Sequence, residues 1–129
     1  MKPAPFRYVA ARSVDETLAL LAEHGADGKI LAGGQSLVPL LNMRLARPQV
    51  IVDINGIRAL AYIRRKDDRL HVGALTRQRA AEESATVRRQ VPLLGEAIRF
   101  VGHPQIRNRG TVGGSLAHAD PSAELPAVV

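Results

Sequence analysis

Two glycine pairs flanked by hydroxyl residues are the strongest chemical signals in this sequence. The first, Gly33-Gly34-Gln35-Ser36, follows the strand-like run Lys29-Ile30-Leu31-Ala32. The second, Thr111-Val112-Gly113-Gly114-Ser115, repeats the arrangement much later in the chain. Glycine tolerates positive φ, so a bend of this kind lets successive main-chain N–H groups converge on an anion. Both segments are therefore candidates for binding a phosphate.

The first pair stands where an anion site is expected. An apolar strand leads into it, and the pattern from Leu37 to about Arg44 predicts a helix whose N-terminus adds free N–H groups. Ser36 is positioned to cap that helix and adds a hydroxyl. The segment suits a phosphate or pyrophosphate, although such a glycine pair is also a common tight turn. It is neither the Rossmann fingerprint nor a Walker loop, since Gly28-Lys29 is followed by Ile30. Two such bends could face one another across a groove and hold the two phosphates of a dinucleotide.

The other polar residues form no recognisable catalytic or metal-binding pattern. The absence of cysteine excludes disulfides, thiolate metal sites and an iron–sulfur cluster bound by these residues. No serine lies in a G-x-S-x-G elbow, so nucleophilic catalysis has no support. His103, His118 and Asp120 lack a zinc spacing, and Asp120 suits an Asx turn or a helix cap. We therefore expect no catalytic residue and no metal ligand.

The chain is basic and poor in aromatic residues. Its formal net charge is +6, with 46% hydrophobic and 23% charged residues, as in a folded protein. The arginines between Val87 and Gly110 face a single acid, Glu96, and are Arg88, Arg89, Arg99, Arg107 and Arg109. This patch could meet nucleic acid, an acidic partner subunit or an anionic cofactor. Two Tyr, two Phe and no Trp supply few platforms for stacking bases, so we expect no nucleic acid. Arg107 and Arg109 could attract phosphates, but surface positions are the preferred interpretation.

Nothing in the sequence directs the chain into a membrane. No apolar run approaches the roughly 20 residues that span a bilayer. The N-terminus, MKPAPFRYVAARS, lacks the apolar core of a secretory signal. We therefore expect a cytoplasmic protein with no transmembrane segment.

Residues 1–56 are predicted to form a small β-α-β-α-β unit. Phe6 to Val9 suggests a strand, and Ser13-Val14-Asp15-Glu16 is a capping box that opens a helix ending near Gly25. Gln49 to Ile54 is a β-branched strand of the kind buried on both faces. The crossover rule favours parallel pairing of the strands. The expected core residues are Leu18, Leu21, Leu31, Ile51, Val52 and Ile54.

Residues 57–129 change character and predict a second subdomain. Arg65-Lys66-Asp67-Asp68 separates two strand-like segments, which predicts a hairpin and antiparallel pairing. The remaining expected elements are a helix capped by Thr76 and ending at Glu83, a helix from Pro92 to about Val101, a turn-rich loop from Gly102 to Glu124, and the start of a helix at Leu125. Because that last element would stop in its first turn, we expect the subdomain to be incomplete at its C-terminus.

Three stretches of the sequence resemble one protein family. They run from Ala32 to Arg44 (AGGQSLVPLLNMR), from Arg47 to Ile54 (RPQVIVDI) and from Ile106 to Pro126 (IRNRGTVGGSLAHADPSAELP). In this order they resemble the FAD-binding medium subunit of the molybdenum hydroxylases, which includes the xanthine dehydrogenase FAD domain. The aerobic carbon monoxide dehydrogenase medium subunits are the most similar group, and Leu70 to Thr76 also fits. The resemblance covers essentially the whole chain, as the N-terminal part of such a subunit.

The resemblance implies a vanillyl-alcohol-oxidase-like (PCMH-type) FAD-binding fold of the α+β class. A small parallel α/β subdomain (residues 1–56) would be followed by a truncated antiparallel α+β subdomain (residues 57–129), with FAD between them. The pyrophosphate-binding segment carries over to Leu31, Ala32, Gly33, Gly34, Gln35, Ser36, Leu37 and Val38. The contacts implied for the second subdomain are Val101, Thr111, Val112, Gly113, Gly114, Ser115 and Glu124, with Leu116 and Ala117 near the isoalloxazine. Ser115 replaces the Asn of many relatives, a variant common in the carbon-monoxide-dehydrogenase-like group.

The function implied by the resemblance is electron relay in an oxidoreductase. Electrons would leave a molybdopterin centre on a large subunit, cross two [2Fe-2S] clusters on a small subunit, and reach FAD here before passing to an acceptor. The chain would not act on the substrate itself. The residues alone leave open a non-enzymatic basic module that binds nucleic acid or an acidic protein. An oxidase with covalent flavin is disfavoured because the first glycine segment contains no His or Cys.

Overall fold

The computed structural model describes all residues from Met1 to Val129. The chain divides into two compact units, Met1–Arg58 and Ala59–Val129. The expected boundary lay after residue 56.

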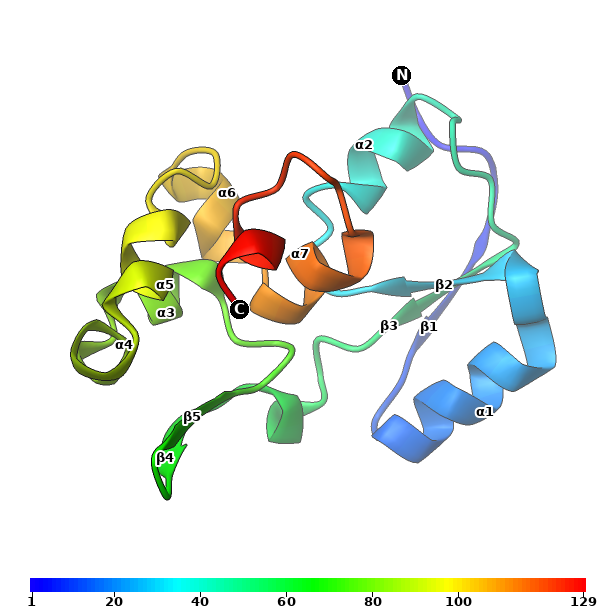
Figure 1. The fold of residues 1–129 in the computed structure, drawn as a ribbon. Coiled ribbons are helices and arrows are strands. Elements are labelled where there is room, and N and C mark those ends of the chain that lie inside the picture. Colours follow the sequence, from blue (N-terminus) through cyan, green and yellow to red (C-terminus); the bar gives the residue numbers. More distant parts are fainter. The chain divides into compact units, whose positions relative to one another are not determined.

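The first unit is built on three parallel strands (Figure 1). Its elements are β1 (Arg7–Ala10), α1 (Val14–His24), the 3-10 turn η1 (Gly25–Asp27), β2 (Gly28–Leu31), α2 (Leu37–Asn42) and β3 (Val50–Asp53). The strand order is β1-β3-β2, with Ile51 of β3 in register with Tyr8 of β1 and Lys29 of β2. Val50, Ile51 and Val52 are all buried, as a β-branched run in a central parallel strand should be. The predicted β-α-β-α-β order and parallel pairing are confirmed.

Helix α1 begins at the predicted capping box. Ser13 Oγ accepts a hydrogen bond from the N–H of Glu16 at 3.1 Å, and the Glu16 carboxylate accepts one from the N–H of Arg12 at 2.7 Å. The expectation that Leu18 belongs to the core is wrong, since this residue is 59% exposed. Thr17 is buried on the face of α1 that packs on the sheet, and the Leu21 side chain lies on the same face. Thr17 can be buried because its hydroxyl donates to the carbonyl of Ser13.

The second unit combines one hairpin with short helices (Figure 1). Its elements are η2 (Arg58–Leu60, which spans the boundary), β4 (Ile63–Lys66), β5 (Arg69–Val72), α3 (Gln78–Glu83), α4 (Ala85–Gln90), α5 (Pro92–Ile98), α6 (Pro104–Arg109), α7 (Val112–His118) and η3 (Leu125–Ala127). The predicted hairpin is confirmed, with Ile63 paired to Val72 and Asp67 at φ 54° in the turn. The core cluster of buried residues is Ala81, Val87, Leu94, Ile98, Val112 and Leu125. None of the helices combines the length and apolarity needed to cross a bilayer.

The predicted turn-rich loop from Gly102 to Glu124 is wrong, because α6 and α7 lie within it. Pro104 stands in the first turn of α6, where its missing N–H costs little. Thr111 Oγ1 accepts from the N–H of Gly114 at 3.0 Å and caps α7. The glycine pair lowers the helix propensity of this segment, but the cap and the packing of α7 outweigh that preference.

Two further helix boundaries differ from the sequence-based expectation. Thr76 does not cap α3, because its hydroxyl donates to the carbonyl of Tyr62 at 2.8 Å. Helix α4 was not expected, and it begins where Ser84 Oγ accepts from the N–H of Val87 at 3.3 Å. A serine or threonine hydroxyl can hydrogen-bond to several nearby main-chain groups. The sequence alone therefore does not show which serine or threonine caps a helix.

We expect Ser13→Ala to lower the free energy of unfolding by about 1 kcal/mol, because the cap hydrogen bond to Glu16 is lost. Ser36→Ala is the matched control: Ser36 occupies the same N-cap position of α2, yet its hydroxyl makes no cap hydrogen bond. Its effect should stay within about 0.5 kcal/mol. Urea unfolding of the flavin-free protein measures both, and equal losses would contradict the assigned cap.

Candidate functional site

The first glycine segment forms a bend between β2 and α2 with a row of unpaired N–H groups. Gly34 has φ 73°, in the left-handed region that favours glycine. The N–H of Val38 donates to the carbonyl of Gly34 at 3.0 Å, which closes the bend. No group of the protein accepts from the N–H groups of residues 33 to 37. A run of free, successive N–H groups is the feature by which main-chain segments bind anions.

The carbonyls of the same segment are engaged within the protein. Leu31 O accepts from the N–H of Ile54 at 3.1 Å, Ala32 O from Asn55 Nδ2 at 2.8 Å, and Gly33 O from Gln35 Nε2 at 3.0 Å. The bend therefore offers donors to a ligand while its acceptors are already used. This asymmetry favours an anion over a cation.

Ser36 does not cap α2, so that part of the prediction is wrong. A side-chain cap needs an extended backbone at the N-cap residue, whereas Ser36 is helical with φ −99° and ψ −45°. Its hydroxyl consequently has no partner in the protein. The side chain is exposed and can contact a bound anion instead.

Asn55, which the sequence analysis did not single out, ties the end of β3 to the glycine bend. Its Nδ2 donates to Ala32 O at 2.8 Å and to Asp53 Oδ1 at 2.6 Å, and its N–H donates to the same carboxylate oxygen at 2.8 Å. Asn55 and Ala32 are 23 residues apart in the chain. No local pattern could have marked the contact, although the prediction that β2 and β3 are parallel neighbours places both residues at one end of the sheet.

The second oxygen of Asp53 is held by Tyr8. The Tyr8 hydroxyl donates to Asp53 Oδ2. This hydrogen bond stabilises the neutral phenol and raises the pKa of Tyr8 above its ordinary value, with smaller contributions from desolvation and from the negative charge of Asp53. The carboxylate at the end of β3 is thus surrounded by donors.

The second glycine segment is the first turn of α7 and offers no comparable row of N–H groups. The N–H groups of Val112 and Gly113 donate to Thr76 O and Ala74 O, both at 2.9 Å, and that of Gly114 donates to Thr111 Oγ1. The expectation that this segment presents free main-chain N–H groups to a phosphate is therefore wrong. Contact through its other atoms stays a prediction.

Gly113 is required by close packing. A Cβ at this position would lie 2.6 Å from Ala74 Cβ and 2.7 Å from Ala74 O, which is too close for any side chain. Ser115 follows in the same turn, half-buried, and its hydroxyl has no partner in the protein. The segment can therefore offer a ligand a hydroxyl and a surface free of bulky side chains.

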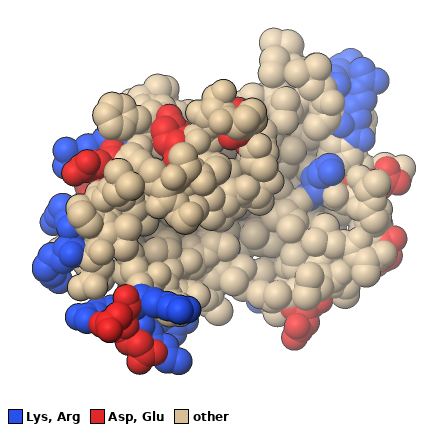
Figure 2. Space-filling model, viewed as in Figure 1, with Lys and Arg blue, Asp and Glu red and all other residues tan.

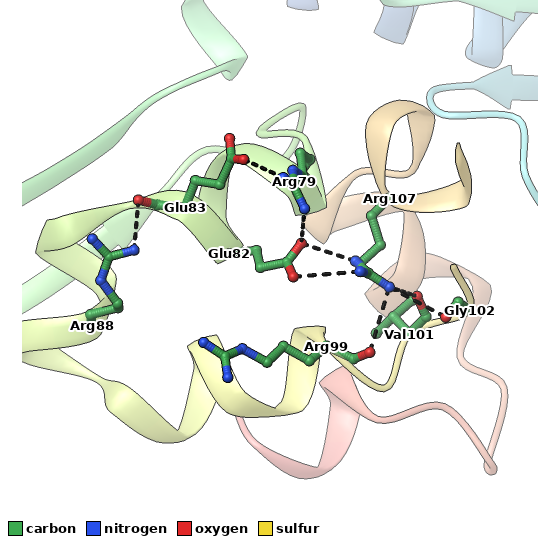
Figure 3. A network of polar contacts seen from close by, with 8 residues as sticks. All are labelled: Arg79, Glu82, Glu83, Arg88, Arg99, Val101, Gly102 and Arg107. Carbon is green, nitrogen blue, oxygen red and sulfur yellow. Dashed lines mark hydrogen bonds and ion pairs between the residues drawn. The ribbon is translucent and has the colours of Figure 1, made fainter. Parts of the chain in front are cut away.

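Arg107 is neither a surface residue nor available to a phosphate, because it forms a buried ion pair (Figure 3). Its side chain is 8% exposed and that of Glu82 is 12% exposed. Nε lies 2.9 Å from Glu82 Oε2, and Nη2 lies 3.4 Å from Oε1. Nη1 donates to the carbonyls of Val101 at 3.2 Å and Gly102 at 3.3 Å. The turn that carries Val101 is therefore fixed to α3 and α6 by one guanidinium.

The other predicted site residues of the second unit surround its core. Val101 and Leu116 pack against the core cluster that includes Val112 and Leu125. Glu124 directly precedes Leu125, and its half-buried carboxylate makes no hydrogen bond or ion pair with the protein. Within this unit, Val101, the α7 segment and Glu124 are thus brought around one apolar cluster.

The basic residues do not form one continuous surface on the face in Figure 2. Lys and Arg side chains stand beside Asp and Glu at the tip of the β4–β5 hairpin, at the lower left, and other basic groups are separate. Arg65 of that hairpin pairs with Asp68 at 3.1 Å. His103, His118 and Asp120 do not converge, and the structure contains no group of three or more His, Cys, Asp or Glu that could hold a metal ion.

The Tyr8–Asp53 hydrogen bond predicts an alkaline titration. Because the pKa of Tyr8 is raised, the neutral phenol and its hydrogen bond should persist below pH about 10 and be lost only as the pH rises through the raised value. The difference between the tyrosinate absorbance titrations of the unchanged protein and Tyr8→Phe isolates this residue. Asp53→Asn should return the midpoint toward the ordinary value. A midpoint at or below that value in the unchanged protein would refute the contact.

We expect Arg107→Leu to lower the free energy of unfolding by about 3–5 kcal/mol, because it leaves the Glu82 carboxylate buried without its main partner. The double variant Arg107→Leu/Glu82→Leu should recover part of this loss. Arg79→Leu is the control, since the more exposed Arg79 contacts the same carboxylate at 3.3 Å and should cost about 1 kcal/mol or less. Urea unfolding followed by circular dichroism decides, and similar losses for Arg79→Leu and Arg107→Leu would rule the buried pair out.

Comparison with known proteins identifies the family. Residues 4–129 match the FAD binding domain in molybdopterin dehydrogenase. The whole chain is 57% identical to the 6-hydroxypseudooxynicotine dehydrogenase complex subunit alpha of Paenarthrobacter nicotinovorans, of which it covers 44%. It is 43% identical, over 99% of its length, to the carbon monoxide dehydrogenase medium chain of Hydrogenophaga pseudoflava, of which it covers 45%.

Solved structures agree with the sequence relatives. A structure of carbon monoxide dehydrogenase from Hydrogenophaga pseudoflava matches 98% of this chain with a TM-score of 0.96 and 44% identity, and 44% of that chain is covered. Quinoline 2-oxidoreductase from Pseudomonas putida 86 matches with a TM-score of 0.93 and 43% identity. The chain thus spans less than half the length of the relatives that it matches. The predicted resemblance and fold class are confirmed, and this chain belongs to the family of FAD-binding domains of molybdopterin dehydrogenases.

Proposed function

We propose that this chain binds FAD in a cytoplasmic molybdopterin-dependent dehydrogenase complex and relays electrons from iron–sulfur clusters on a partner subunit to an acceptor. FAD is the cofactor of the family to which the chain belongs. When bound, it supplies the redox chemistry, and the protein supplies binding and orientation. The relatives are described as a complex subunit and as a medium chain, which supports partnership with a large molybdopterin subunit and a small [2Fe-2S] subunit. These 129 residues contain no cysteine, so the clusters would need thiolates from elsewhere.

The row of free N–H groups at residues 33 to 37 is the observation that carries this proposal. A diphosphate presents many acceptor oxygens and no donor, which matches a bend whose donors are free and whose carbonyls are engaged. The residues of unit 1 proposed to hold the FAD diphosphate are Leu31, Ala32, Gly33, Gly34, Gln35, Ser36, Leu37 and Val38. Gly33 to Leu37 would donate through the main chain, and Ser36 would add its hydroxyl.

The second unit is proposed to contact the same cofactor in a different way. The N–H groups of Val112 to Gly114 already donate to acceptors within the protein. The segment from Thr111 to Ser115 would therefore offer the Ser115 hydroxyl, and its glycines would let the cofactor approach the main chain closely. Val101 would supply an apolar contact, and the unpartnered Glu124 carboxylate would accept a hydrogen bond from the cofactor. No residue is assigned a catalytic role on the substrate.

Gly34→Ala should lower the affinity for FAD about tenfold, because a Cβ at φ 73° costs roughly 1–2 kcal/mol and the bend relaxes to avoid it. The added Cβ would also lie 3.1 Å from side-chain atoms of Leu31 and Val38. Gly25→Ala is the matched control, since Gly25 has φ 51° and open space around its Cβ position. It also has a positive φ that disfavours a side chain, and it lies outside the proposed site.

The measurement is the FAD dissociation constant of the full-length subunit in its complex, with the thermal unfolding midpoint recorded for both variants. The proposal expects loss of FAD affinity for Gly34→Ala alone. Equal FAD affinity in the two variants, or no FAD in the unchanged complex, would exclude the first glycine bend as the diphosphate site.

A further inference from the structure

We propose that Asn55 is the residue that orients the N–H groups of the glycine bend for the diphosphate, acting as a positioning residue. The inference rests on the proposed FAD function and concerns what holds the site in a binding geometry. Asn55 follows β3 and is half-buried. Its Nδ2 lies within hydrogen-bond distance of three oxygens, at 2.6 Å from Asp53 Oδ1, 2.8 Å from Ala32 O and 3.4 Å from Leu31 O. Because all three neighbours are acceptors, only the NH2 end of the carboxamide can face them.

The contact with Ala32 determines where the next N–H group points. The carbonyl of Ala32 and the N–H of Gly33 belong to one planar trans peptide unit, in which they point in opposite directions. Holding that carbonyl toward Asn55 therefore turns the Gly33 N–H away from the end of β3. Gln35 acts in the same way one unit later, since its Nε2 holds the carbonyl of Gly33 and so turns the N–H of Gly34.

Asn55 also binds a carboxylate at the same end of the sheet. Asp53 stands at the end of β3, where an unscreened carboxylate would oppose a bound diphosphate. Asn55 donates to Asp53 Oδ1 through both its main-chain N–H and its Nδ2, while Tyr8 holds Oδ2. The Asn55 side chain thus performs both tasks. It holds the Ala32 carbonyl toward the end of β3, and it hydrogen-bonds the Asp53 carboxylate, whose charge would otherwise oppose the bound diphosphate.

Two substitutions test both contacts of the Asn55 side chain together. Asn55→Ala removes the donor, and Asn55→Asp replaces it with a second carboxylate facing Ala32 O and Asp53. We expect the affinity of the full-length complex for FAD to fall about tenfold for Asn55→Ala, which loses the side-chain hydrogen bonds to Ala32 O and Asp53 Oδ1. The fall should be larger for Asn55→Asp, which also adds like-charge repulsion. Gln49→Ala is the matched control, because Gln49 donates from Nε2 to the Asp27 carboxylate at 3.0 Å near the start of β3, away from the bend. It should bind FAD as the unchanged protein does.

Phosphorus NMR of the bound FAD distinguishes positioning from a loss of stability. In Asn55→Ala saturated with FAD, the diphosphate resonances should shift while the visible spectrum of the flavin stays unchanged, and Gln49→Ala should show neither effect. Asn55→Ala carries the test if Asn55→Asp does not fold. An affinity loss clearly below tenfold in Asn55→Ala, or unshifted resonances, overturns the inference. If Gly34→Ala weakens FAD binding and Asn55→Ala does not, only the role of Asn55 fails; if the unchanged complex holds no FAD, the proposed function itself fails.

Discussion

The polarity of the peptide units that leave β2 is the constraint on which the proposed cofactor site depends. Four successive carbonyls, from Leu31 to Gly34, accept hydrogen bonds from Ile54, Asn55, Gln35 and Val38, whereas the N–H groups of residues 33 to 37 have no partner. A peptide unit with its oxygen held on one side must present its N–H on the other. The bend is therefore a one-sided surface of donors, and its preference for an anion follows from geometry before any charged residue is considered.

The two glycine pairs look alike in the sequence but solve different physical problems. Gly34 is needed for its backbone conformation, since φ 73° is strained for other residues. Gly113 is needed for space, since α7 passes so close to Ala74 that no Cβ fits. The first glycine leaves N–H groups free, and the second belongs to a helical turn that uses them. A glycine motif thus indicates a close or strained backbone, and only the hydrogen-bond pattern around it shows whether a ligand can use that backbone.

The sequence predicted the features that depend on neighbouring residues. The capping box at Ser13, the hairpin turn at Asp67 and the parallel β-α-β order each follow from a few adjacent side chains or from a general rule of chain topology. The burial of Thr17 and exposure of Leu18 on α1, the packing of Gly113 and the burial of Arg107 were missed because they depend on residues distant in the chain. The family resemblance supplied candidate site residues without supplying the way in which each one would act.

Net charge is a poor guide to where this chain would bind an anion. Arg107, which precedes the second glycine segment and was a candidate phosphate ligand, has its charge satisfied by Glu82 and its remaining N–H groups satisfied by main-chain carbonyls. Burying the Arg107 guanidinium without those partners would be strongly unfavourable. Arg107 therefore stabilises the packing of this unit and is not available to a ligand. The glycine bend contains no arginine or lysine at all between Leu31 and Val38. Neutral dipoles whose directions are fixed in advance need no reorganisation when a ligand arrives, and in the proposed site this preorganisation would favour the diphosphate without a cationic side chain.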